Sequence, residues 1–324
     1  MSVDFTVAIP TYNGASRLPK VLDKLRSQTG TEQISWEVIV VDNNSTDETA
    51  QVVREYQADW SVDCPLKYCF ELEQGLVFAR QRAVKEARGE LVGFLDDDNW
   101  PAIDWVNNAY TFGQQHPKAG AYGSKIHGKF EIEPPENLKK IIFYLAIIDR
   151  GLQPLQYKPR QNGVPPGAGL VVRRDVWREN VPSCQFFTGR IDSCLVASED
   201  EEALLYIHLA GWEIWYNPAM EIQHFIPAKR LEKSYFKDLM RSIGLSRYYL
   251  RMLSLQSWQR PLASLLYLVN DTRKVIEHFL RYRKLIKSDI VVACEMERLL
   301  GTLISPFYLG YLKIYKIIKS LNSQ

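Results

Sequence analysis

Three short apolar segments that end abruptly in polar residues constrain the fold of this chain most strongly. They span residues 5–9, 37–41 and 91–95, and Pro, Asn or Asp follows each of them at once. Segments with the spacing of a helix face lie between them, such as residues 18–28, where apolar side chains recur three and four apart. This alternation predicts an α/β fold with a mostly parallel mixed sheet between helices, in which ligands bind beyond the carboxyl ends of the strands.

The same order continues further along the chain. We expect strands at 66–70 and 170–172 and helices at 75–87 and 198–210, and from about residue 234 the pattern is that of several helices. An apolar stretch at 213–222 resembles a strand, and His224 follows it. The second part of the chain is therefore predicted to be mainly helical.

Composition and cysteine spacing narrow the class of protein. The chain of 324 residues is 46% hydrophobic and 24% charged, which is ordinary for a globular protein. Its five cysteines form no C-x-x-C pair, so neither a disulfide framework nor structural zinc is indicated. The first residues lack the pattern of a signal peptide, and the longest uncharged apolar run, 299–312, is too short to span a bilayer. These features predict a cytoplasmic location.

The run Asp96-Asp97-Asp98, directly after an uncharged strand, is the strongest chemical signal. If the strand continues, Asp96 and Asp98 share one side while Asp97 turns away. Clustered carboxylates repel one another unless a cation lies between them, and Mg²⁺ or Mn²⁺ prefers such oxygen ligands together with phosphate oxygens. The alternative is an acidic turn that caps the next helix.

Four motifs in order resemble the family-2 glycosyltransferases with the GT-A fold. They are a strand followed by Pro10-Thr11-Tyr12-Asn13, the segment 41–47, Gly75-x-x-x-Ala79-Arg80, and the segment 94–98. The resemblance covers roughly residues 4–230 and extends to bacterial exopolysaccharide enzymes, including cyanobacterial hormogonium polysaccharide glycosyltransferases. It implies a GT-A domain over 1–230, with a nucleotide-sugar-binding half (1–100) and an acceptor-binding half (101–230), and a helical, basic region over 231–324.

The resemblance also implies a nucleotide site. Its members would be Pro10, Thr11, Tyr12, Asn13, Asp42, Gly75, Arg80, Asp96 and Asp97. Thr11 and Tyr12 would line the base, and Asp42 would bond the base or the ribose. Arg80 would lie beneath the nucleotide. From the residues alone, Asp42 could equally cap a helix, and Arg80 could be a solvated helix residue.

The resemblance also implies a set of metal ligands and a catalytic base. Asp98 and His224, with Asp96, would hold Mn²⁺ or Mg²⁺, which takes up the charge left on the departing phosphate. Asp200 would be the catalytic base, with Glu199 as the alternative. The plain interpretations are a helix N-terminus rich in carboxylates and a structural histidine. The loop 165–169 resembles the acceptor-side segment.

Together these expectations describe an inverting, metal-dependent transfer of a sugar from a UDP-sugar to a hydroxyl of a glycan or lipid-linked acceptor, in exopolysaccharide or cell-surface glycan synthesis. A sugar-nucleotide pyrophosphorylase is the rival enzyme, but residues 10–13 are not the glycine-rich basic loop that a triphosphate requires. A non-catalytic glycan-assembly protein would not need Asp98, Asp200 and His224 together.

The end of the chain is basic. From Lys229 onward there are 18 Lys and Arg against 7 Asp and Glu, although the net charge of the whole chain is only +2. Residues 310–321 place Lys313, Lys316 and Lys319 three apart among apolar residues, which predicts a short basic amphipathic helix. Such a helix can bind an anionic membrane, here the cytoplasmic face of the plasma membrane, or pack on the body of the protein. No nucleic-acid-binding motif is present, so no nucleic-acid partner is expected.

Overall fold

The computed structural model describes residues 3–188 and 198–321, with side chains up to residue 311. These residues form two compact units. Unit 1 contains residues 3–131, 143–188 and 199–226, and unit 2 contains residues 132–142, 198 and 227–321. The division into domains 1–230 and 231–324 stays a prediction.

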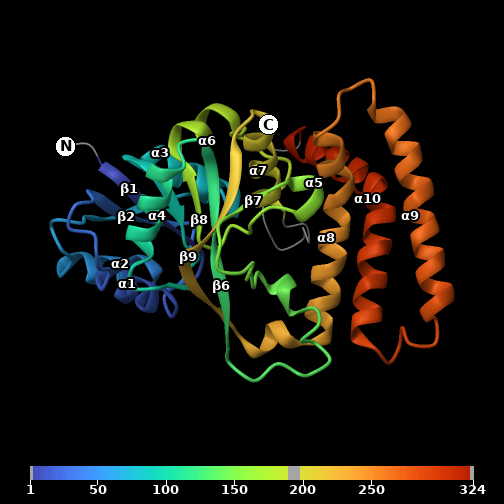
Figure 1. Ribbon diagram of the computed structural model, residues 1–324, viewed down its shortest axis with the longest axis horizontal. Coiled ribbons are helices and arrows are strands. Elements are labelled where there is room, and N and C mark those ends of the chain that lie inside the picture. The colour runs from blue at the N-terminus through green and yellow to red at the C-terminus, as the bar shows by residue number, and fades with distance from the viewer. Residues whose placement is uncertain (1–2, 189–197, 322–324) are drawn as a thin grey trace. The chain divides into compact units, whose positions relative to one another are not determined.

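Unit 1 is built on one mixed sheet (Figure 1). The strands are β1 (Val3–Thr11), β2 (Trp36–Asp42), β3 (Leu66–Phe70), β4 (Gly89–Phe94), β5 (Asn99–Pro101), β6 (Ala119–Phe130), β7 (Leu155–Tyr157), β8 (Leu170–Arg173) and β9 (Glu213–Ile226). Their order is β3-β2-β1-β4-β8-β6-β9-β5, with β7 paired to β9. The first four run parallel, whereas β8 is antiparallel to both of its neighbours. The expected α/β class with a mixed sheet between helices is confirmed.

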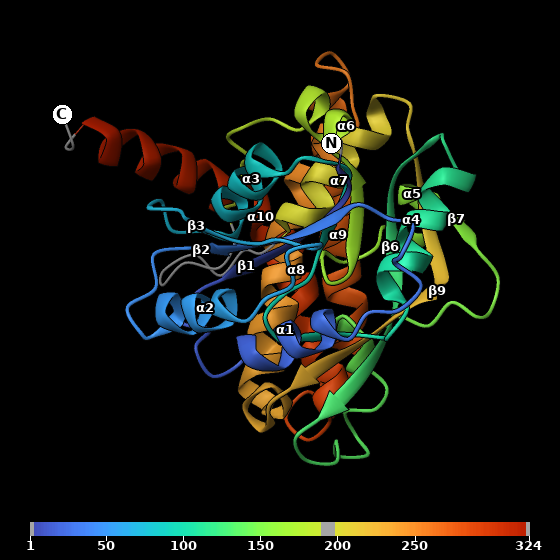
Figure 2. The ribbon, with the colours of Figure 1, turned by 90° about the vertical axis from the view of Figure 1, so that its left-hand side faces the viewer.

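Helices cover both faces of this sheet because successive residues of its strands are apolar and point to opposite faces. The helices are α1 (Leu18–Arg26), α2 (Thr49–Ala58), α3 (Leu76–Glu86), α4 (Trp105–Gln115), α5 (Pro159–Asn162), α6 (Arg174–Asn180) and α7 (Glu199–Leu209), with a helical turn η1 at Ile142–Leu145. Val7 and Val38 belong to the core beneath α1, α2 and α4, and Ala8 and Ile39 belong to the core beneath α3, α6 and α7. Figure 2 shows α1 and α2 on one side of β1 and β2, with α3 on the other. The strands are therefore buried on both faces, as near-continuous apolar runs require.

The expected strands and helices agree with the structure, apart from their ends. The strand expected at 213–222 continues to Ile226, so His224 lies inside β9 and not after it. The expectation was wrong because the polar residues Gln223 and His224 interrupt the apolar run after Ile222, while pairing of β9 with β6 and β5 continues. Hydrogen bonding to neighbouring strands decides where a strand ends, and the local sequence does not show which strands will be neighbours.

A buried carboxylate on β2 links side chains of the neighbouring strands β1 and β3. Glu37 in β2 is fully buried and accepts hydrogen bonds from the Thr6 hydroxyl at 3.0 Å and from the backbone and side chain of Arg88, both at 2.8 Å. Lys67 forms an ion pair with it at 2.9 Å. Burial raises the pKa of Glu37, but the bonds from Arg88 and Lys67 together lower it below its ordinary value.

We expect Glu37→Gln to lower the free energy of unfolding by about 2 kcal/mol at neutral pH, because charged donors lose their acceptor. A lowered folded-state pKa gives stability that is present above the unfolded value near 4.5 and is lost as pH falls through the folded value. Urea unfolding of the wild type and the variant should therefore converge in acid. Glu90→Gln on β4, an exposed acid paired to Arg173, is the matched control. Equal unfolding midpoints for wild type and Glu37→Gln at pH 7 would contradict this account.

Unit 2 consists mainly of helices. They are the turn η2 (Ala228–Leu231), α8 (Lys233–Leu253), α9 (Arg260–Tyr282) and α10 (Ile290–Leu321). Gly244 and Gly301 let α8 and α10 approach closely, since a Cβ on Gly301 would lie 2.6 Å from the Arg241 carbonyl oxygen. Arg251 of α8 binds Asp271 of α9 at 2.6 Å.

The amphipathic helix expected at 310–321 is the last part of α10, which continues through Pro306. The side chains of Lys313, Lys316 and Lys319 lie outside the described residues, so their role stays a prediction. No helix in the described part of the chain has the length and apolar character needed to cross a membrane.

Candidate active site

The loops that follow β1 and β2 are joined to each other at one edge of the sheet. β1 and β2 are parallel, with Thr11 in register with Asp42. Asn13 has a positive φ of 48°, and its backbone N–H donates to the Ser45 hydroxyl at 2.9 Å. Its side-chain oxygen accepts the Thr46 N–H at 2.8 Å. Two motifs that are 32 residues apart in sequence therefore form one surface.

Asp42 shapes this edge from within. Its carboxylate accepts hydrogen bonds from the Tyr68 hydroxyl at 2.8 Å and from the Ser45 N–H at 2.9 Å, and the residue is buried. Burial, followed by the bond to Asp42, raises the pKa of Tyr68 to about 12. Both oxygens of Asp42 thus hold protein groups. The neighbouring Asn43 accepts the Gly75 N–H at 2.7 Å, which ties this loop to the start of α3.

The acidic run forms a turn and does not extend β4. β4 ends at Phe94, and the Asn99 N–H donates to the Asp96 carbonyl at 2.9 Å. The Asn99 side chain accepts the Asp96 N–H at 3.1 Å and donates to an Asp98 carboxylate oxygen at 3.0 Å. Asp97 is directed away from Asp96 and Asp98, as expected, but strand alternation is not the cause, because the chain has already left the strand. Asn99 is fully buried, and its two side-chain hydrogen bonds fix the Asp96 backbone and the Asp98 carboxylate. The sequence analysis did not single out this residue.

Asp97 is directed to the loop after β1. It accepts bonds from Arg17 Nε at 2.7 Å, from a second Arg17 nitrogen at 2.9 Å and from the Thr11 hydroxyl at 2.6 Å. The bond to Asp97 raises the pKa of Arg17, against the effect of burial. A Cβ at Gly14 would lie 2.7 Å from the same carboxylate, so only glycine leaves it room. Arg17 was not foreseen, since one arginine before a helix carries no recognisable signal.

Asp98 and His224 are brought together by the pairing of β5 with β9. Asn99 is in register with His224, and the Phe225 N–H donates to the Asp98 carbonyl at 2.9 Å. His224 Nδ1 lies 3.0 Å from the Leu145 carbonyl oxygen, which can only accept, so Nδ1 carries a proton. His224 Nε2 then lies 3.6 Å from Asp98 Oδ2. Orientation of an imidazole by a backbone carbonyl is common for metal-ligating histidines.

Asp96 lies beside this pair and beside Arg80. Its side chain is 34% exposed, and Arg80 lies 3.8 Å from one of its oxygens. Partial loss of solvation raises its pKa in spite of Arg80, and Asp98 adds to the rise while His224 opposes it. A divalent cation would relieve the repulsion between these two carboxylates.

The residues present fit a divalent ion that also binds a ligand. In the part of the chain that the structure describes, no three His, Cys, Asp or Glu side chains form a preformed metal cluster. Asp98 and His224, with Asp96 adjoining, supply oxygen and imidazole donors for part of a coordination sphere. Mg²⁺ and Mn²⁺ commonly complete theirs with waters and phosphate oxygens.

Asp200 lies in the first turn of α7 and forms an ion pair with Arg80 of α3. Its other oxygen accepts the Gly167 N–H at 2.9 Å. Arg80 is 2% exposed, so it is a buried cation between Asp96 and Asp200 and not a solvated helix residue. The structure therefore brings residues from α3, the β4 turn, the loop 165–169 and α7 to one point.

Glu199 and Glu202 lie in the first turn of α7 with Asp200 but have other surroundings. The Glu199 carbonyl accepts a bond from Gln185 at 2.8 Å, and the residue is buried. Glu202 is fully buried and accepts the Phe186 and Phe187 N–H groups, both at 3.0 Å. Asp200 is the acid that pairs with Arg80 and accepts the Gly167 N–H. Glu202 was not foreseen as the anchor of the segment before α7.

Gly167 is in tight contact with this cluster, because a Cβ there would overlap both Arg80 and Asp200. We expect Gly167→Ala to cost about 2 kcal/mol of unfolding free energy, through displacement of the buried ion pair. Thermal or urea unfolding checks this. Gly310→Ala, where a Cβ meets open space, should leave stability unchanged or slightly higher. Equal stability of Gly167→Ala and wild type would show that the pair shifts without cost.

Of the remaining predicted residues, Pro10 and Gly75 are buried and Tyr12 is exposed. Tyr12 is 46% exposed on the loop after β1. Gly75 has a φ of 141°, and a Cβ there would lie 2.6 Å from the Thr188 carbonyl. Gly169 accepts a bond from Ser124 of β6 at 2.7 Å, which fixes the end of the loop 165–169.

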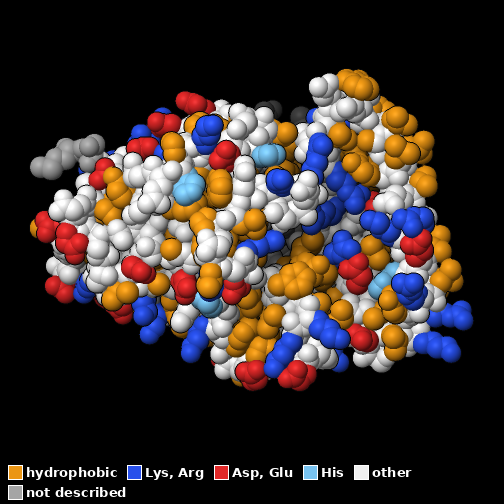
Figure 3. Space-filling model, viewed as in Figure 1, with side chains coloured by type: hydrophobic (Ala, Val, Ile, Leu, Met, Phe, Trp, Pro, Cys, Tyr) orange, Lys and Arg blue, Asp and Glu red, His pale blue; other side chains and the backbone are white. Residues whose placement is uncertain are grey.

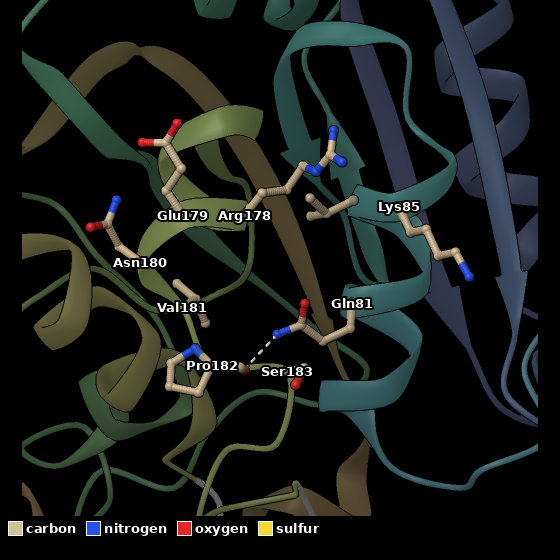
Figure 4. Close-up of a pocket in the computed structure, with 9 residues that line it drawn as sticks. Gln81, Lys85, Arg178, Glu179, Asn180, Val181, Pro182 and Ser183 are labelled. Atoms are coloured by element: carbon tan, nitrogen blue, oxygen red, sulfur yellow. Dashed lines mark hydrogen bonds between the residues drawn. The ribbon is translucent and has the colours of Figure 1, made fainter.

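A pocket of about 500 Å³ lies outside this cluster (Figure 4). It is lined by Gln81 and Lys85 of α3, by Arg178 of α6 and by residues 181–183. Gln81 donates to the Pro182 carbonyl at 2.9 Å. None of the predicted site residues lines it, so the chemistry is located by the buried charges and not by this cavity.

Comparison with known proteins identifies the family of the chain. Residues 6–179 match the family model described as glycosyl transferase family 2. An uncharacterized glycosyltransferase, YfnE of Bacillus subtilis, is 32% identical over 42% of this chain and 35% of its own length. A GalNAc(5)-diNAcBac-PP-undecaprenol beta-1,3-glucosyltransferase of Campylobacter jejuni is 31% identical over 42% of this chain and 40% of its own. The chain therefore spans well under half of these relatives.

A solved structure extends the likeness of the fold. The mannosyltransferase PcManGT of Pyrobaculum calidifontis, in complex with GDP-Man and Mn²⁺, matches 95% of this chain and 88% of its own with a TM-score of 0.60. The sequence identity is 20%, so the match concerns the fold.

Proposed function

The chain belongs to glycosyl transferase family 2, and on that basis we propose that it transfers one sugar from a nucleoside diphosphate sugar to an acceptor hydroxyl. The observation that carries this proposal is the buried charge cluster at the carboxyl edge of the sheet. Arg80, Asp96 and Asp200 meet there, and Asp98 lies beside His224. Buried charges that are this concentrated are costly and are typical of catalytic sites.

On the donor side, Asp98 and His224, with Asp96, would hold Mn²⁺ or Mg²⁺. When bound, the ion supplies positive charge that stabilises a departing diphosphate. Arg80 would bind the donor phosphates from below, because a guanidinium can donate two parallel hydrogen bonds to phosphate oxygens. Pro10, Thr11, Tyr12, Asn13 and Asp42 would shape the nucleotide site. We propose a UDP-sugar as donor, with GDP-mannose, which PcManGT carries, as the comparison.

On the acceptor side, Asp200 would act as the base. It removes the hydroxyl proton as the acceptor oxygen forms a bond to the anomeric carbon, and the bond from that carbon to the phosphate oxygen breaks with its electron pair. Attack opposite the leaving group inverts the anomeric centre. Backbone donation from Gly167 orients the carboxylate.

The contact with Arg80 links the two sides. A carboxylate next to a guanidinium accepts a proton less readily. Donor phosphates that draw on Arg80 would weaken its pair with Asp200 and raise the basicity of Asp200. The base would thus become competent when the donor is in place.

The acceptor would be a glycan or a lipid-linked glycan of the cell surface, reached from the cytoplasm. The Campylobacter jejuni relative is named for an undecaprenol-linked acceptor, which supports this class. A panel of nucleotide sugars with Mn²⁺, scored for nucleoside diphosphate release and sugar transfer, tests the proposal. Release of pyrophosphate from a nucleoside triphosphate and a sugar phosphate would instead indicate the pyrophosphorylase. Absence of nucleotide binding across the panel would favour the non-catalytic assembly protein.

A further inference from the structure

Helix α9 carries an exposed apolar face. The exposed residues recur three, four and seven apart, which places them on one side of a helix. They are Leu262, Leu265, Leu266, Val269, Ile276, Phe279 and Leu280, each more than half exposed. We call this set the α9 face. Figure 3 shows hydrophobic side chains along α9, with Lys and Arg gathered towards one end. Soluble proteins rarely expose so continuous a patch unless something binds it.

The rotation of α9 is fixed by polar contacts on its opposite side. Arg251 binds both oxygens of buried Asp271, at 2.6 and 3.3 Å. The Tyr248 and Ser264 hydroxyls bond at 2.7 Å, and His278 Nε2 lies 3.0 Å from the Val292 carbonyl oxygen. Turning the α9 face inward would break these contacts. Its exposure is therefore a property of how unit 2 packs.

The charged residues around the α9 face are mostly basic. The exposed basic residues of α9 and the turn after it are Arg260, Arg273, Lys274, Arg281, Arg283, Lys284 and Lys287. Residues 254–289 contain three acids: Asp271 is paired with Arg251, Glu277 is bonded to Arg273 at 2.6 Å, and Asp289 accepts the Val291 N–H at 2.8 Å. The surface is thus apolar with a cationic margin.

We propose that the α9 face and its basic residues bind the surface of a lipid bilayer that contains anionic headgroups. A helix of this kind lies in the plane of the interface, with its apolar side among the upper acyl groups and its cations at the headgroups. Trp258, 76% exposed just before α9, is a residue type that favours this interface. A second copy of the chain is a poorer occupant, because a symmetric pair would oppose two rows of cations.

Sedimentation of the full chain with vesicles tests this directly. Binding should be strong to phosphatidylcholine mixed with phosphatidylglycerol, weak to phosphatidylcholine alone, and reduced by salt. Leu265→Glu with Val269→Glu should weaken binding at least about tenfold, since apolar contact is lost and negative charge is added. The matched control is the double variant Val62→Glu with Leu152→Glu. These two apolar residues of unit 1 are more exposed than Leu265 and Val269, and this variant should bind vesicles as wild type does. Lys284→Gln with Lys287→Gln should weaken binding by roughly tenfold or more.

Three results would overturn the proposal. One is unchanged binding by the Leu265 and Val269 double variant when circular dichroism shows that it is folded. Another is equal binding to neutral and anionic vesicles. The third is a concentration-dependent dimer that the same variant abolishes without any vesicle binding, which would assign the α9 face to a second copy. Donor binding in the absence of lipid should be equal in wild type and in the double variant, so the sugar-transfer proposal stands or falls separately.

Discussion

Asp200→Asn is expected to lower the rate of sugar transfer by about a thousandfold, the usual contribution of a positioned general base. Donor affinity should be unchanged or tighter, because Arg80 loses its partner on α7 and can bind phosphate without competition. Initial rates of transfer and equilibrium binding of the nucleotide sugar, measured on the same preparation, separate the two effects.

Two variants from the same helical turn are the controls for this prediction. Glu199→Gln tests the alternative base, and Glu201→Gln tests the general effect of removing a charge from the start of α7. Both should retain turnover. Full activity in Asp200→Asn together with loss in Glu199→Gln would transfer the role of base to Glu199.

Asp98→Asn is expected to weaken metal-dependent donor binding by roughly a hundredfold, because an amide is a poorer ligand for a hard cation than a carboxylate is. Calorimetric titration with a UDP-sugar in Mn²⁺ and in a chelator gives both affinities. Wild type should bind tightly only with metal, and the variant should bind weakly in both conditions.

The control for the metal prediction is Asp104→Asn, an exposed acid that follows β5. This variant should bind the UDP-sugar with the same affinity as wild type, both in Mn²⁺ and in chelator. Equal affinity of the wild type in Mn²⁺ and in chelator would remove the ion from the proposed site and leave Arg80 as the main phosphate ligand.

Much of the fold follows from local sequence. Residues 37–41 and 91–95 are apolar enough to be buried on both faces, and the loops that end them are polar, so their place in a layered sheet could be predicted. The turn at Asp96 could not, because it depends on buried Asn99, whose two side-chain bonds point back along the chain. An asparagine after acids looks like any polar loop residue.

The candidate site was also only partly predictable from the sequence, because motifs identify some of its residues but not the partners that contact them. Asp98 and Asp200 were singled out from motifs, and the structure places each among other charged groups. Their partners depend on contacts across the fold: Arg17 reaches Asp97 over 80 residues, and Gly167 bonds Asp200 over 33. Position in three dimensions also explains why Arg80, which looks like an ordinary helix arginine in sequence, is a buried cation.

A crystal structure of the chain with a UDP-sugar and Mn²⁺, with anomalous scattering used to locate the ion, tests the proposed metal and donor site directly. We expect one Mn²⁺ peak in contact with Asp98 and His224, the diphosphate beside Arg80, and Asp200 on the acceptor side of the sugar. A nucleotide bound elsewhere, with Asp96 and Asp98 turned to solvent and no Mn²⁺ near them, would contradict it.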